Sequence, residues 1–105
     1  MTEFEQVLQQ VLREIPKYEI PLSYLGKIKL ARRITDNFMK DSSQVIAPKL
    51  IIYKQEDNKP LETVKCKALS TERCDNIRFE EVEFCIISNW ETNEAKLYFE
   101  TAKCQ

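Results

Sequence analysis

The chain has 105 residues, of which 43% are hydrophobic and 31% charged, and its formal net charge is −1. It has no histidine, which excludes Ser/His/Asp and Cys/His nucleophilic pairs and any metal site that needs an imidazole ligand. Its one glycine, Gly26, excludes a glycine-rich phosphate loop, because such loops need several positions of positive φ or close backbone approach. The composition predicts one α+β domain over residues 1–105 that binds a macromolecule and is not an enzyme.

The amino terminus has no basic stretch followed by an apolar run, and no long apolar run occurs elsewhere. We therefore expect a cytoplasmic protein with no membrane contact. Cysteines in such a compartment are expected to be thiols. Their spacing contains no C-x-x-C pair, so we expect no zinc site, no other metal and no cofactor. The four cysteines are Cys66, Cys74, Cys85 and Cys104.

Two helices are expected in the first part of the chain. Thr2 followed by Glu5 has the form of a capping box, and apolar residues then recur at helical spacing as far as Ile15. Pro16 is expected to end this helix, and a second begins near Ser23 and ends near Asp41. The side of the second helix that we expect to be apolar carries Tyr24, Leu25, Ile28, Ala31, Ile34, Thr35 and Phe38.

Four stretches rich in β-branched and aromatic residues predict strands at 45–53, 61–69, 79–88 and 95–103. The last two alternate in polarity and are separated by turn residues, so they are expected to form a hairpin. Pro48 cannot donate a ladder hydrogen bond, which predicts that the first strand lies at an edge or is bulged there. The simplest fold packs both helices on one face of a roughly four-stranded, mainly antiparallel sheet.

Charge is distributed unevenly along the sequence. Residues 16–54 carry a net charge of +5, whereas residues 55–105 carry −4. The basic residues of the second helix could line up to neutralise phosphates, which makes nucleic-acid binding the alternative function. A solvated helix face is the structural alternative for the same residues. They are Lys27, Lys29, Arg32, Arg33 and Lys40.

The carboxylates of the second half suggest a different surface. An acidic sheet face could dock on a basic partner, as inhibitors do when they cover a cationic site. Trp90, among polar turn residues, would serve either as an anchor in that interface or as a cover for the end of the core. Outward-facing Glu residues also occur simply to deter edge pairing, and in that case these glutamates would bind no partner. The expected partner-binding residues are Glu81, Glu83, Trp90, Glu91 and Glu94.

Glu81 and Glu83 are also expected on one side of a strand, where a carboxylate pair could do acid/base work. Nothing else in the sequence supports an enzyme. The function we expect is therefore that of a protein-binding module, as an inhibitor or regulatory subunit, with nucleic-acid binding as the alternative. A homodimer formed through an edge strand is compatible with both.

Overall fold

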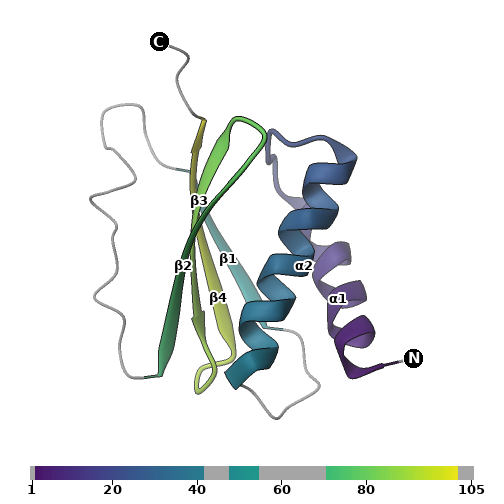
Figure 1. The fold of residues 1–105 in the computed structure, drawn as a ribbon, viewed down its shortest axis with the longest axis vertical. Coiled ribbons are helices and arrows are strands. Elements are labelled where there is room, and N and C mark those ends of the chain that lie inside the picture. The colour runs from purple at the N-terminus through teal and green to yellow at the C-terminus, as the bar shows by residue number, and fades with distance from the viewer. Residues whose placement is uncertain (1, 42–47, 55–70, 102–105) are drawn as a thin grey trace.

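The computed structural model describes residues 2–41, 48–54 and 71–101. Its two helices, α1 and α2, pack side by side against one face of a four-stranded sheet (Figure 1). The predicted α+β class and the predicted position of both helices on one face are confirmed. Among the described residues, no helix is both long and apolar enough to cross a membrane.

The first helix, α1, runs from Glu3 to Glu14 and begins where the capping pattern predicts. The Thr2 hydroxyl accepts a hydrogen bond from the Glu5 amide at 3.2 Å, which satisfies one of the free amides of the first turn. A short 3₁₀ helix at Ile15–Lys17 follows, with Pro16 near its start. Because α1 ends directly before this segment, the predicted effect of Pro16 is confirmed.

The second helix, α2, spans Tyr24–Asp41, which matches the predicted range. The Ser23 hydroxyl caps it by accepting a hydrogen bond from the Gly26 amide at 3.1 Å. Buried side chains recur along the helix at Leu30, Ile34 and Phe38, which gives α2 an apolar stripe toward the rest of the protein.

The sheet has the order β1-β4-β3-β2. Its strands are β1 (Lys49–Lys54), β2 (Glu72–Phe79), β3 (Val82–Asn89) and β4 (Glu94–Thr101). The β2–β3 and β3–β4 pairs are antiparallel, but β1 pairs with β4 in parallel, so the sheet is mixed. The predicted hairpin of the last two strands is β3–β4. As expected from Pro48, which directly precedes it, β1 is an edge strand.

The prediction for the strand at 79–88 was wrong at its start. Phe79 ends β2, and a turn at Glu80 and Glu81 separates it from β3. The sequence pattern predicted no strand at 72–78 because this segment is mostly polar. It is nevertheless an edge strand, and edge strands carry charged residues far more readily than central ones. The predicted strand 61–69, like residues 45–47 and 102–103, lies outside the described residues.

The core lies between the helices and the inner face of the sheet. Alternate residues of β3 and β4 point to this face, and none of them is more than 2% exposed: Val82, Phe84, Ile86, Ala95, Leu97 and Phe99. From the helical side, Val7, Val11 and Leu30 are fully buried. This interleaved packing fixes α2 firmly beside β2 and β3.

Candidate functional site

The amino-terminal end of α2 is held by the turn between β2 and β3. The Glu80 carboxylate accepts a hydrogen bond from the Ser23 hydroxyl at 2.5 Å and another from the Ser23 amide at 3.1 Å. In an ordinary capping box, an acidic side chain at the third helical position accepts from the amide of the capping residue. Here that third position is Gly26, so a carboxylate from a distant turn takes the role.

This arrangement explains why the one glycine of the chain stands where it does. A Cβ atom at Gly26 would collide with the Glu80 carboxylate and press against Leu22. Glu80 itself has a positive φ of 56°, a conformation that glutamate rarely adopts. The hydrogen bonds from Ser23 lower the pKa of Glu80, which favours the charged form beside the helix amino terminus.

We expect the Glu80→Gly variant to loosen the start of α2 while the fold persists. Glycine accepts the positive φ without strain, but the variant removes the acceptor for the Ser23 amide and hydroxyl. Hydrogen exchange should therefore accelerate at the amides of Ser23 and Gly26, and remain unchanged in β3. Unchanged exchange at the start of α2 would contradict the capping role assigned to Glu80.

Tyr24 and Leu25 form an exposed apolar pair on this helix end. Their side chains are 82% and 60% exposed, and they are the large hydrophobic residues that the described part of the chain leaves exposed. The prediction that they belong to the buried side of α2 was wrong. The sequence did contain a signal, because Leu25 shares its side of the helix with Lys29 and Arg32, at spacings of four and seven residues.

The predicted basic stripe on α2 is partly occupied by intramolecular contacts. Arg33 contacts the Asp75 carboxylate with Nε at 2.6 Å and a second guanidinium nitrogen at 3.0 Å. Lys40 lies 3.4 Å from the Asp36 carboxylate, one helical turn earlier. Lys27 is half-buried.

The other two basic residues, Lys29 and Arg32, are exposed. Over residues 2–41, 48–54 and 71–101, neither makes an ion pair. Lys29 lies close enough to Glu80 to help lower the pKa of that carboxyl group. The structure therefore leaves two of the five predicted nucleic-acid-binding side chains exposed and, among the described residues, without an ion pair.

Asp75 connects α2 to the edge strand β2. Its carboxylate accepts the two hydrogen bonds from Arg33 and a third, at 2.6 Å, from the side-chain amide of Asn37. Asp75 is only 15% exposed at its side chain and Asn37 is buried. Hydrogen bonding to Arg33 lowers the pKa of Asp75 and raises that of Arg33. Arg33 is thus a structural residue of the helix–sheet contact.

The predicted acidic surface is divided between the two ends of β3. Glu81 lies in the β2–β3 turn and Glu83 near the start of β3, whereas Trp90 and Glu91 lie in the β3–β4 turn. At about 3.3 Å per residue, β3 keeps the two groups roughly 20 Å apart. The structure therefore keeps the two groups apart. Glu81 lies in the turn and not on β3, so the prediction that Glu81 and Glu83 share one side of a strand was wrong.

Basic residues also interrupt the acidic surface. Arg78 is the register partner of Glu83, and Lys49 is the register partner of Glu94. Side chains of register partners point to the same face, so each of these glutamates has a cation beside it. Trp90 is half-buried, and its backbone amide donates a hydrogen bond to the Thr71 carbonyl at 3.3 Å.

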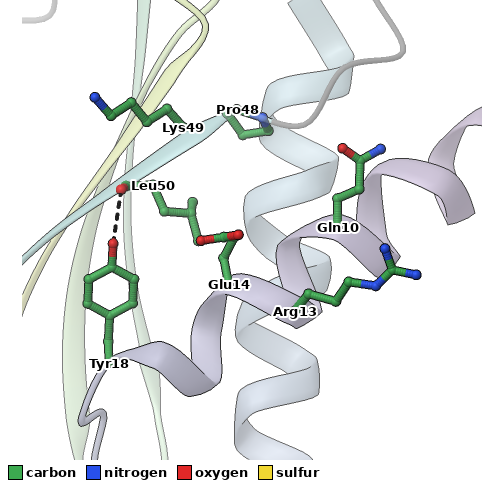
Figure 2. A pocket seen from close by; sticks show the side chains of 7 residues that line it. All are labelled: Gln10, Arg13, Glu14, Tyr18, Pro48, Lys49 and Leu50. Carbon is green, nitrogen blue, oxygen red and sulfur yellow. Dashed lines mark hydrogen bonds between the residues drawn. The ribbon is translucent and has the colours of Figure 1, made fainter.

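A polar cleft of about 510 Å³ lies between α1 and the start of β1 (Figure 2). The Tyr18 hydroxyl donates a long hydrogen bond of 3.4 Å to the Leu50 carbonyl on the outer edge of β1. The side chains of Arg13 and Lys49 extend away from each other (Figure 2), so the two cations do not converge on one ligand position. The cleft is lined by Gln10, Arg13, Glu14, Tyr18, Pro48, Lys49 and Leu50.

Two cysteines are adjacent on the sheet. The sulfur of Cys74 on β2 lies 3.6 Å from that of Cys85 on β3. Cys85 is a buried thiol. Cys74 is disulfide-bonded, so the prediction that Cys74 is a thiol was wrong. In the described part of the chain, no three Cys, Asp or Glu side chains are grouped closely enough to hold a metal ion.

The Cys85 thiol is expected to be unreactive in the folded protein. It is only 1% exposed, and burial together with the nearby Asp75 carboxylate raises its pKa, which suppresses the reactive thiolate. Alkylation of Cys85 by a maleimide, followed by mass spectrometry of the Cys85 peptide, should proceed only as fast as the protein unfolds. Rapid labelling under native conditions would contradict this.

No protein-family model, curated protein or solved structure matches this chain. Its own geometry is therefore the basis for inferring its function.

Proposed function

We propose that this protein is a protein-binding module whose contact surface is centred on Tyr24 and Leu25. These two residues, called the α2 anchor below, support the proposal because they are large, apolar and exposed on a rigidly held helix end. Tyrosine is enriched among the few residues that supply most of the energy of protein interfaces. The Glu80 contact to Ser23 holds the anchor in place, which reduces the entropy lost on binding.

Three observations favour a protein over nucleic acid as the partner. Arg33 and Lys40 already contact Asp75 and Asp36, so few cations remain to neutralise phosphates. Leu25 offers no ring on which a base could stack, although Tyr24 does. The sequence pI of about 5.6 is also low for a protein that binds nucleic acid.

The α2 anchor also suits protein binding better than the acidic residues do. Glu83 and Glu94 each have a basic register partner. The length of β3 also separates Glu81 and Glu83 from Trp90. The binding role proposed here involves no catalysis. The regulatory or inhibitory role, the cytoplasmic location and the edge-strand homodimer stay predictions.

Site-specific photo-crosslinking tests the proposed function. The photoreactive amino acid benzoylphenylalanine is placed at Tyr24 in the full chain, and in a control at Gln9, an exposed position on α1. Irradiation in cells should give protein adducts from position 24 that are absent from position 9. Equal adducts at both positions, or adducts removed by nuclease rather than by protease, would refute protein binding through the α2 anchor.

A further inference from the structure

The α2 anchor is bordered by two exposed cations on the same helix. Lys29 and Arg32 follow Leu25 at spacings of four and seven residues, which places all three on one side of α2. The half-buried Ile28 follows Tyr24 by four residues and extends the apolar part of this surface. The result is an apolar patch with positive charge along one border.

We propose that the α2 anchor binds an acidic segment of another protein, one that carries an apolar side chain for Tyr24 and Leu25 and carboxylates for Lys29 and Arg32. This inference rests on the proposed function and adds the chemistry of the partner. Charge complementarity supports it, because the guanidinium of Arg32 can bind a carboxylate through two parallel hydrogen bonds. Opposite charge at the border of a patch also steers association.

The acidic residues near this surface offset only part of its positive charge. Glu80 is charged and lies near Lys29, so it offsets part of the charge of that side chain, whereas Asp36 lies against Lys40. Asp75 is held by Arg33 and Asn37 on the side of α2 that faces β2. Arg32 therefore remains exposed, and over the described residues no carboxylate forms an ion pair with it.

A second copy of the chain fits this surface poorly. A two-fold interface joins the same patch of both copies, and among Tyr24, Leu25, Ile28, Lys29 and Arg32 no side chain carries a carboxylate that could pair with the two cations. Like charges facing each other across an interface oppose association. A separate, acidic partner satisfies both the apolar patch and the cations.

Selection of peptides from a random library tests the chemistry of the partner directly. The full chain is immobilised, short displayed peptides are selected on it, and the enriched peptides are then tested on three double variants. Tyr24→Ala/Leu25→Ala removes the anchor, and Lys29→Gln/Arg32→Gln removes the bordering charge. Arg13→Gln/Lys49→Gln is the matched control, because it lowers the net charge equally at exposed positions on α1 and β1.

Enriched peptides should be acidic and contain an aromatic or aliphatic residue. Neutralising Lys29 and Arg32 should weaken their binding about fivefold or more, as expected for two exposed charge pairs, and the control should change it by less than about twofold. Added salt should weaken binding to the unmodified chain more than binding to the Lys29/Arg32 variant.

The two proposals fail in different ways. Enriched peptides that depend on Tyr24 and Leu25 but are neutral or basic would overturn the acidic partner and leave protein binding through the anchor intact. Peptides that bind all three variants equally, or a library that yields no enriched peptide, would overturn the acidic partner as well. Failure of crosslinking at position 24 would overturn the proposed function itself.

Discussion

Asp75→Ala is expected to destabilise the folded protein by about 2–3 kcal/mol, as the loss of a partly buried, charge-assisted hydrogen-bond network does. The substitution removes the acceptor for three hydrogen bonds from Arg33 and Asn37. Arg33 is 43% exposed and can be hydrated, so most of the loss comes from the buried Asn37 amide and from the loosened contact between α2 and β2.

Urea unfolding followed by circular dichroism measures this loss, with Asp36→Ala as the control. Asp36 also contacts a cation, Lys40, but both side chains are more than half exposed. Its removal should change the free energy of unfolding by no more than about 0.5 kcal/mol, the range for an exposed pair within one helix. Equal losses for the two variants would contradict the structural importance of the Asp75 network.

The same network predicts a dependence on pH. Since the pKa of Asp75 is lower in the folded protein, protons bind the unfolded chain more readily at this site, and the stabilisation is complete above the unfolded pKa. It is lost as the pH falls below about 4, toward the lowered folded pKa. The stability difference between the unmodified chain and Asp75→Asn should shrink over that acid range. A difference that does not vary with pH would contradict the assigned cause.

Tyr24→Ala/Leu25→Ala is expected to weaken binding of the protein partner by about a hundredfold, which corresponds to the loss of a central hot spot. The fold should persist, because side chains that are 82% and 60% exposed contribute little buried area. The melting temperature and the dissociation constant of the variant, measured together, separate the two effects. Gln9→Ala/Gln10→Ala, at exposed positions on α1, is the control and should change neither.

A melting temperature that falls sharply in the Tyr24/Leu25 variant would show that these residues stabilise the fold. An unchanged dissociation constant would show that the partner binds elsewhere. Either result would contradict the role of the α2 anchor.

The sequence predicted the helices well because their signals are local. The Thr2 cap, the helical spacing of apolar residues and Pro16 all act within a few residues of the elements that they define. The edge strand β1 was located by the same kind of signal, since Pro48 cannot donate a ladder hydrogen bond. Its parallel pairing with β4 depends on the path of the chain between distant segments, which no local pattern encodes.

The strand β2 and the turn after it were missed for a physical reason. The inward position of Asp75 is filled by a carboxylate paired with Arg33, which shortens the alternation of apolar and polar residues in β2 to the segment from Asn76 to Phe79. The turn has Glu80 at positive φ where glycine or asparagine would be the expected signal. Both features depend on contacts with α2, from residues more than 40 positions away.

In the candidate site, too, the features that depend on contacts between distant residues could not be predicted from the sequence. Lys29 and Arg32 were predicted as exposed cations and are exposed, whereas Arg33 contacts Asp75, which no sequence pattern places beside it. Tyr24 and Leu25 were assigned to the core because apolar residues on a helix are usually buried. The position of Leu25 on the same side of the helix as Lys29 and Arg32 was a signal against burial, which this general rule outweighed.

The most direct measurement of the central claim is a nuclear magnetic resonance titration of the full chain with the partner purified by affinity to the unmodified protein. Chemical-shift changes are expected to be largest at Tyr24, Leu25, Ile28, Lys29 and Arg32. Changes confined to the β3–β4 turn around Trp90, or to the cleft beside Leu50, would contradict binding through the α2 anchor.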